Sequence, residues 1–381
     1  LLYLFVNDMK VAVFLTYNYS LQTWYNSGTL KRELEIYNQI NILNNAKFTF
    51  YTYGGSEDLE LIRDFPNFNV VPMFKKLATK GKVHRFLYSL FIPFLFKKNI
   101  ENEDIIHQHQ LLGSWVVIIS KLIYNKKLLI RTGYDMYEFS ILNNERFIRK
   151  ILLKCLTYIS LKFSDFYTAT SQEDIKFLNS NFRIGNEKIK LRPNWIIDNN
   201  FKKIDSRVSN EILSVGRLDK QKNYKKLISF FNKDCEFSLK IIGSGPEKDE
   251  LKELISNNEL KVSIVDNLNN EDIKKEMNNY KYYISLSEFE GNPKTILEAM
   301  SSGCIVIASN IKNHKEIIEH NTTGFLYDLN SQVMLKILKK LENSHDLQEK
   351  ISLNAAKTIL KSNDISIISK QMSEDYKFLL K

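Results

Sequence analysis

Short runs of β-branched and aromatic residues alternate with longer stretches of helical periodicity along the whole chain. Such runs are typical of buried strands, and their alternation with helices indicates parallel sheets with helices on both faces. The pattern therefore predicts an α/β protein with doubly wound parallel sheets. The predicted strands cover residues 11–16, 47–53, 105–109, 127–131, 166–170, 212–215, 237–242, 261–265, 282–286 and 305–308.

The length of the chain, 381 residues, predicts two domains, because a single core rarely grows to this size. A short polar stretch at 202–210 separates two series of strands and helices. We therefore expect a first domain over residues 1–200 and a second over 201–362. The final segment, 363–381, is amphipathic, and we expect it to form a helix that packs back on the first domain.

The three cysteines lie far apart and lack metal-ligand spacing, so neither a disulfide framework nor a structural zinc site is expected. A reducing cytoplasm is the simplest compartment. The apolar runs 87–96 and 111–119 are shorter than the roughly 20 residues of a membrane-spanning helix. The first eight residues lack the features of a signal peptide, and we interpret them as an upstream extension of the reading frame.

The net charge of +10 comes mainly from the first 200 residues, where 26 Lys and Arg face 18 Asp and Glu. Within them, 74–98 carries seven cations and no acid, interleaved with aromatic and aliphatic residues. Two interpretations stay open: a peripheral contact with an anionic membrane, or a core helix with a solvated basic face. Nucleic acid is not an expected partner, because no recognition motif accompanies the charge.

The stretch EFEGNPKTILEAM at 288–300 is the most informative chemical motif. The predicted strand 282–286 precedes it, and the stretch itself reads as a Gly-Asn-Pro turn and a helix, with Glu290 in the loop and Glu298 early on the helix. Pro293 is expected in the first helical turn, where its missing N–H costs nothing. The positive end of this helix suits an anion, whereas the two carboxylates suit sugar hydroxyls. Such an arrangement favours a nucleotide sugar as ligand.

Two more strands of the second half end in glycine-containing turns. Gly216 and Arg217 follow the strand at 212–215, with Lys222 close behind, and these two cations suit a diphosphate. A second turn, Gly243-Ser-Gly245-Pro246, follows the next strand, although by itself such a turn is more often only a tight connection between strand and helix. Because open α/β sheets bind ligands at the carboxyl ends of their strands, we expect all three elements to line one crevice.

The order of these motifs resembles the retaining glycosyltransferases of family 4, which have the GT-B fold: two Rossmann-like domains facing across a cleft. The resemblance is specific over 212–327 and looser in the first 200 residues. It implies a nucleotide-sugar donor, UDP- or GDP-linked, and a glycan or lipid-linked glycan acceptor in surface polysaccharide synthesis. The cysteine pattern and the basic stretch 74–98 add the expectation of a cytoplasmic enzyme with peripheral contact at the inner face of the cell membrane.

The resemblance assigns roles to individual residues. Arg217 and Lys222 would bind the donor diphosphate, Glu290 the donor sugar and Glu298 the ribose. His109, at a strand end, would face the transferred sugar, the alternative being a satisfied buried histidine; it completes the catalytic set of Glu290, Arg217, Lys222 and His109. The predicted donor site comprises Gly216, Arg217, Lys222, Gly243, Gly245, Glu290, Gly291, Asn292, Pro293, Lys294 and Glu298, and the acceptor side Ser27, Gly28, Arg131 and Tyr134.

No Asp-x-Asp motif follows a strand of the first domain, and no histidine, cysteine and carboxylate cluster has ligand spacing. We therefore expect neither a metal nor another cofactor, with Arg217, Lys222 and a helix dipole compensating the phosphate charge. The resemblance implies attack of an acceptor hydroxyl on the same face that the phosphate leaves, with retention of configuration.

Three other classes stay open at this point. An epimerase or phosphorylase of similar build is one, although an epimerase is expected to lack the pair Glu290 and Glu298. A non-enzymatic nucleotide-sugar or glycan-binding protein would tolerate loss of Arg217 or Lys222, and both are present. A membrane-surface scaffold acting through 74–98 is the third.

Overall fold

The chain divides into two compact units. The structure is a computed structural model, and it describes residues 9–75, 81–183, 185–197, 201–328 and 330–381. Unit 1 comprises Leu1–Pro193 and Ser366–Lys381, and unit 2 comprises Asn194–Ile365. The sequence-based boundaries were at residues 200 and 362, whereas the units divide after Pro193 and Ile365. The suggested extension at 1–8 lies outside the described residues.

Unit 1 is built on a seven-stranded parallel sheet with the order β3-β2-β1-β4-β5-β6-β7. The chain winds from β1 to one edge and then crosses to β4 and the other edge, so the order reverses between β1 and β4. The strands are β1 (Lys10–Phe14), β2 (Lys47–Thr52), β3 (Phe68–Pro72), β4 (Ile105–His109), β5 (Lys127–Arg131), β6 (Phe166–Ala169) and β7 (Ile189–Leu191).

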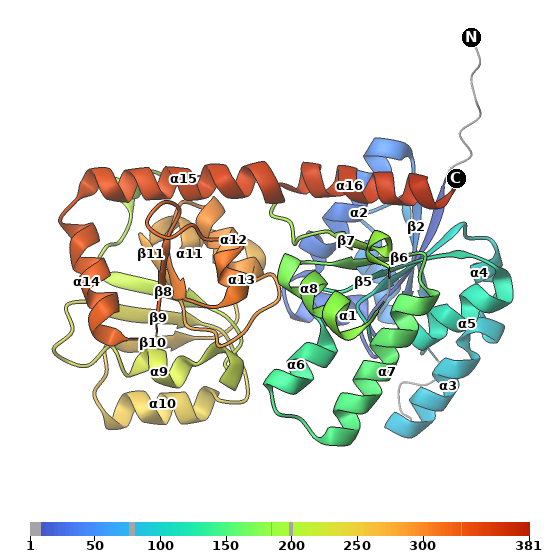
Figure 1. Cartoon of the computed structure of the whole chain (residues 1–381), viewed down its shortest axis with the longest axis horizontal. Coiled ribbons are helices and arrows are strands. Elements are labelled where there is room, and N and C mark those ends of the chain that lie inside the picture. The colour runs from blue at the N-terminus through green and yellow to red at the C-terminus, as the bar shows by residue number, and fades with distance from the viewer. Residues whose placement is uncertain (1–8, 76–80, 184, 198–200, 329) are drawn as a thin grey trace, which may run out of the picture. The chain divides into compact units, whose positions relative to one another are not determined.

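Helices cover the sheet of unit 1 (Figure 1). One of them comes from the far end of the chain: the Tyr376 hydroxyl lies 2.6 Å from His107 Nδ1, and Asp375 accepts two hydrogen bonds of 2.6 Å from Arg192. The helices are α1 (Leu21–Asn26), α2 (Leu30–Asn44), α3 (Lys82–Leu95), α4 (Lys97–Glu101), α5 (Ser114–Tyr124), α6 (Met136–Leu142), α7 (Phe147–Phe163), α8 (Gln172–Asn181) and α16 (Ile365–Leu379), with short 3-10 turns η1 (Ser56–Ile62) and η2 (Asn186–Lys188).

Unit 2 repeats this plan with six parallel strands in the order β10-β9-β8-β11-β12-β13, and its order reverses between β8 and β11. The strands are β8 (Glu211–Val215), β9 (Ser238–Ile242), β10 (Val262–Val265), β11 (Tyr282–Ser285), β12 (Ile305–Ser309) and β13 (Phe325–Tyr327). The helices are η3 (Ile204–Ser206), η4 (Lys220–Lys222), α9 (Tyr224–Ile228), α10 (Lys248–Asn257), α11 (Asn270–Asn279), α12 (Lys294–Ser301), α13 (Lys312–Lys315), α14 (Ser331–Glu342) and α15 (His345–Asn363).

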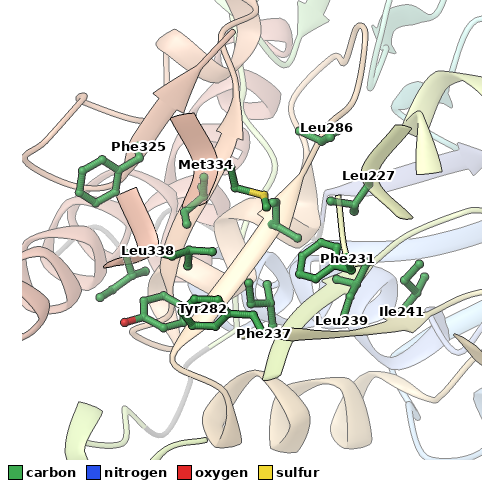
Figure 2. Close-up of a cluster of buried hydrophobic side chains, with 14 of the residues drawn as sticks. Leu227, Phe231, Phe237, Leu239, Ile241, Tyr282, Leu286, Phe325, Met334 and Leu338 are labelled. Atoms are coloured by element: carbon green, nitrogen blue, oxygen red, sulfur yellow. The ribbon is translucent and has the colours of Figure 1, made fainter. Parts of the chain in front are cut away.

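Alternation along each strand of unit 2 separates two cores. Ile305 and Ile307 of β12 belong to one buried cluster, while Val306 and Ala308 belong to another. Because successive side chains of a strand point to opposite faces, these are the two faces of one sheet. Figure 2 shows the first cluster, in which Phe237, Leu239 and Ile241 pack with Tyr282 and with Met334 and Leu338 of α14.

The predicted strands are all present, and the prediction of doubly wound parallel sheets is confirmed. Three short strands were not predicted: β3, β7 and β13. All three are edge strands, with one side of the ladder unpaired. Several of their side chains are only half-buried, so neither the apolar run of a central strand nor a strict alternation marks them in the sequence.

Candidate functional site

A buried ion pair lies where the strand order of unit 2 reverses. Lys222 ends η4, which follows β8, and Glu290 lies between β11 and α12. Lys222 Nζ is 2.5 Å from Glu290 Oε1, and the two side chains are 18% and 9% exposed. Such a reversal point opens a crevice at the carboxyl ends of the strands, which is where α/β sheets bind ligands. The structure thus brings together two residues of the predicted donor site that are far apart in the sequence.

Gln221 supports this pair. Its Nε2 donates to the Phe289 carbonyl at 2.8 Å and approaches Glu290 Oε2 at 3.4 Å. The main-chain carbonyl of Gln221 accepts a hydrogen bond from the main-chain amide of Glu288 at 2.9 Å. The turn after β8 and the loop after β11 are therefore joined by both main-chain and side-chain hydrogen bonds. No feature of the sequence singled out Gln221 beyond its position next to Lys222.

The loop before α12 is held by asparagines. Asn313 Nδ2 donates to the Gly291 carbonyl at 2.8 Å. Asn194 donates its amide to Asn292 Oδ1 at 2.9 Å and its Nδ2 to the Asn292 carbonyl at 2.6 Å. These bonds fix the main chain at the beginning of α12, where a ligand anion would meet the first amides. Asn194 and Asn313 were not predicted as site residues.

The prediction for Pro293 needs one correction. Pro293 is the N-cap of α12, with extended backbone (φ −70°, ψ 105°), and Lys294 is the first helical residue. A proline N-cap has no side-chain acceptor, and α12 has no capping side chain. The Lys294 side chain lies over Trp195, with Nζ 5.3 Å from the ring centre. Glu298 is on the second turn of α12 and is buried.

The predicted glycines of the donor site have a packing role. A Cβ on Gly243 would lie 1.9 Å from the Gly216 carbonyl oxygen, and one on Gly245 would lie 2.3 Å from that of Leu218. The two turns are bridged by main-chain bonds from Gly216 to Ile242 at 3.0 Å and from Leu218 to Ser244 at 2.9 Å. Close contact between the loops after β8 and β9 therefore requires glycine here, whether or not a ligand binds.

Arg217 differs from Lys222 in its surroundings. Its side chain is 73% exposed, and its Nε lies 3.5 Å from Asp219 Oδ2. Asp219 accepts from the Lys222 amide at 3.3 Å and so caps η4. The structure therefore contains one buried cation fixed on Glu290 and one exposed cation in the same turn, close to the end of β8.

His314, on the short helix α13, is a buried neighbour of this site that the sequence did not indicate. Its Nδ1 lies 2.9 Å from the Ser309 carbonyl, and Ser309 Oγ donates to the Ser287 carbonyl at 2.6 Å. Burial lowers the pKa of His314 to about 4, against the opposing effect of the negative Glu290. The imidazole is therefore neutral at physiological pH, and its Nε2 has no hydrogen-bond partner among the described residues.

Unit 1 has a buried polar cluster at its own reversal point. His109 ends β4, and its Nε2 lies 3.6 Å from Glu33 Oε2 of α2, which also pairs with Arg32 at 3.2 Å. Arg131 ends β5 and is the register partner of His109. Burial lowers the pKa of Arg131, and the charge of Glu33 raises it. Glu33 is therefore the carboxylate that faces this group of donors, and no sequence motif marked it.

The remaining acceptor-side predictions lie in loops of unit 1. Ser27 ends α1, and its Oγ donates to the Trp24 carbonyl at 3.0 Å. Gly28 follows with a φ of 69°, a left-handed conformation that favours glycine. Tyr134, in the loop after β5, is partly exposed, and its ring lies 4.5 Å from that of Phe139. The Trp24 ring lies 5.2 Å from that of His109, so Ser27 and Gly28 follow a helix that packs at the end of β4.

The described residues contain neither a metal-binding cluster nor a membrane-spanning helix. No group of three or more histidine, cysteine or acidic side chains within them has an arrangement that could hold a metal ion. No helix in that part of the chain combines the length and the apolar character needed to cross a membrane.

Comparison with known proteins agrees with this geometry. Residues 197–358 match the family Glycosyl transferases group 1. The chain is 27% identical over 297 residues to N-acetylgalactosamine-N,N'-diacetylbacillosaminyl-diphospho-undecaprenol 4-alpha-N-acetylgalactosaminyltransferase of Campylobacter jejuni, covering 75% of this chain and 80% of that protein. It is also 27% identical to the capsular polysaccharide biosynthesis glycosyltransferase CapH of Staphylococcus aureus, over 75% of this chain and 79% of CapH.

A solved structure establishes the architecture. The Anabaena protein HepE, crystallised with UDP and glucose, superposes with a TM-score of 0.76 over 97% of this chain and 100% of its own, at 15% identity. The fold is GT-B, with two Rossmann-like α/β domains, as predicted. The family match and the relatives together support a glycosyltransferase of the group 1 superfamily.

Proposed function

We propose that this protein is a retaining glycosyltransferase of family 4. It would transfer a sugar from a UDP- or GDP-sugar to a hydroxyl of a glycan or lipid-linked glycan during surface polysaccharide synthesis. The names of the Campylobacter and Staphylococcus relatives support this class of acceptor. The cytoplasm, with contact at the inner face of the membrane, remains the proposed location.

The observation that supports this proposal most is the Lys222–Glu290 pair beside the uncapped N-terminus of α12. Glu290 has two carboxylate oxygens, and Lys222 occupies Oε1 while Gln221 approaches Oε2. A carboxylate held in this way has lone pairs left to accept from sugar hydroxyls. A diphosphate bound next to it would meet Lys222, Arg217 and the helix amides, so a nucleotide sugar fits the charges of the site.

The proposed reaction needs no protein nucleophile. The acceptor oxygen forms a bond to the anomeric carbon while the bond from that carbon to the donor phosphate breaks, and the acceptor proton passes to the departing phosphate oxygen. Arg217, Lys222 and the positive end of α12 stabilise the charge that develops on the phosphate. We propose that these groups suffice without a divalent metal. In this scheme His109 contacts the transferred sugar.

Calorimetric titration with UDP-, GDP- and ADP-sugars in the presence of a chelator tests the donor site. We expect saturable binding of one donor, and at least about tenfold weaker binding in Glu298→Ala, equivalent to about 1.4 kcal/mol. Lys222→Ala is expected to weaken binding similarly. Glu288→Ala and Lys226→Ala are matched controls, because both side chains are exposed. Glu288 lies in the loop of Glu290, and Lys226 lies on α9, just after Lys222.

Two results would contradict the proposal in different ways. Binding that appears only after magnesium or manganese is restored would overturn metal independence. Absence of binding under both conditions would overturn the donor site itself. Once an acceptor is in hand, the anomeric configuration of the product, measured by NMR, decides between retention and inversion.

A further inference from the structure

The outer side of three helices in unit 1 is unusually apolar. Half of the exposed large hydrophobic side chains among the described residues lie on α3, α5 and α7. Helix α5 packs against both α3 and α7, so the three lie next to one another. We call the exposed side of α3, α5 and α7 the α3–α7 face. Monomeric soluble proteins rarely expose apolar patches of this extent without a binding role.

Helix α7 contributes as many of these side chains as α3, six each, and it exposes more large apolar residues than it buries, Leu153 and Leu161 being the buried ones. Its buried side includes the polar residues Thr157 and Ser160, and the latter donates to Ser114 Oγ of α5 at 2.9 Å. Its exposed side repeats at helical spacing and carries Phe147, Ile148, Ile151, Leu152, Tyr158 and Ile159, the first two at 76% and 72% exposure. An ordinary surface helix has the reverse pattern, so the outer side of α7 is built to be covered.

The charges of the α3–α7 face are almost all positive. From Phe147 to Phe163, α7 has Arg149, Lys150, Lys154 and Lys162 and no acidic residue. Helix α3 has Lys82 and Arg85 and likewise no acid. Arg149 pairs with Glu145, just before the helix, at 2.6 Å. Apolar side chains flanked by cations on a short helix are what the headgroup region of an anionic bilayer attracts.

We propose that the α3–α7 face docks on an anionic lipid bilayer, with α7 lying in the headgroup region as the principal anchor. The sequence had suggested membrane contact only for 74–98, and α7 lies outside that stretch. A second copy of the chain is a poorer occupant, because two such faces would bring like charges together. The proposal does not depend on sugar transfer, and it can fail or hold independently of the donor site.

Flotation with lipid vesicles tests the proposal. The full chain is expected to float with vesicles of phosphatidylcholine and phosphatidylglycerol in equal parts, and not with phosphatidylcholine alone. The double variant Ile148→Gln, Leu152→Gln should bind at least about tenfold less, because it removes apolar area without changing charge. Ile42→Gln, Leu43→Gln is the matched control, since these residues are also exposed but lie on α2, away from the α3–α7 face.

A label on the native chain keeps the test independent of folding defects in the variants. Cys155 is exposed on α7, whereas Cys235 and Cys304 are buried, so a polarity-sensitive maleimide dye should react selectively with Cys155. Its emission is expected to rise and shift to the blue with anionic vesicles, and lipids brominated on their acyl chains should quench it.

Several outcomes would overturn the proposal. Failure of the wild-type chain to float, equal binding of the α7 and α2 variants, or no change in the Cys155 dye would each do so. Concentration-dependent dimerisation without lipid, lost in the α7 variant, would show instead that a second copy covers the face. Donor binding of the α7 variant, measured by calorimetry, should equal that of the wild type.

Discussion

At the scale of single residues, Glu33 has the most consequential environment in unit 1. It is buried, pairs with Arg32 and lies 3.6 Å from His109 Nε2, and its charge opposes the lowering of the Arg131 pKa that burial causes. Loss of one partner of a buried charge group is costly, since the other charge stays buried without compensation. Glu33→Gln keeps the shape of the side chain and removes only its charge, so it isolates this effect.

We expect Glu33→Gln to lower the free energy of unfolding by about 3 kcal/mol in urea denaturation. Glu35→Gln, on the same helix but half-buried and bonded to Asn38 and Gln39, is the control and should cost less than about 1 kcal/mol. Equal effects of the two substitutions would show that Glu33 has no special electrostatic role.

His314 makes stability depend on pH. Its pKa is about 4 in the folded protein because of burial, against an ordinary value of 6.5. The unfolded chain therefore binds a proton between these values that the folded protein does not, so His314 destabilises the fold as pH falls from 6.5 towards 4. The full effect is about 3 kcal/mol.

Replacing His314 with Gln should flatten this part of the stability curve, which equilibrium unfolding at pH 6.5, 5.5 and 4.5 would measure. The exposed His84 serves as the control, and His84→Gln should leave the pH dependence unchanged. An unaltered slope in His314→Gln would mean that other groups, such as the buried His107, account for the acid sensitivity.

At the scale of elements, the contact between the loops after β8 and β9 rests on glycine. A methyl group on Gly243 would overlap the Gly216 carbonyl, a backbone atom that moves only if its strand moves. We expect Gly243→Ala to lower the free energy of unfolding by about 3 kcal/mol or more. Gly81→Ala is the control: its added methyl meets open space, and thermal unfolding should change little. Similar melting of both variants would contradict the predicted clash.

Comparison of individual strands shows where prediction from the sequence succeeds and where it fails. Central strands such as β4 and β5 were predicted to the residue, because a short apolar run marks each of them, Ile105–Ile106 in β4 and Leu128–Ile130 in β5. The edge strand β3 was missed, since only Phe68 is fully buried in it. For the candidate site, Lys222 and Glu290 were predicted from their motifs. Gln221 and His314 were not, because their roles follow from contacts with residues far away in the sequence.

At the scale of the whole molecule, the division into units has a consequence for folding. Unit 1 is discontinuous: the chain leaves it at Pro193, completes unit 2 and returns with α16. Tyr376 and Asp375 on α16 are bonded to His107 and Arg192, and Ser373 accepts from Asn44 at 2.8 Å. Unit 1 therefore completes its core only after almost all of the chain is present.

Truncation after Ile365 should accordingly destabilise unit 1 and spare unit 2. Hydrogen exchange is the measurement, and we expect faster exchange in β1 and β4 but unchanged protection in β8 and β12. Truncation after Leu379 is the control, because it keeps α16. Equal loss of protection in both units would show that the two fold as one cooperative body.

The sequence by itself determined the class of fold, the central strands, the motifs of the predicted donor site and the excess of positive charge. These features are local: a period of two or of 3.6 residues, a glycine at a strand end, or a carboxylate at a fixed distance from a helix start. Tertiary structure alone decided the rest. It paired Lys222 with Glu290, set Glu33 against His109 and Arg131, buried His314 and turned the apolar side of α7 outward. Each of these depends on which distant segments meet and on how much water they exclude, and no stretch of the chain contains that information on its own.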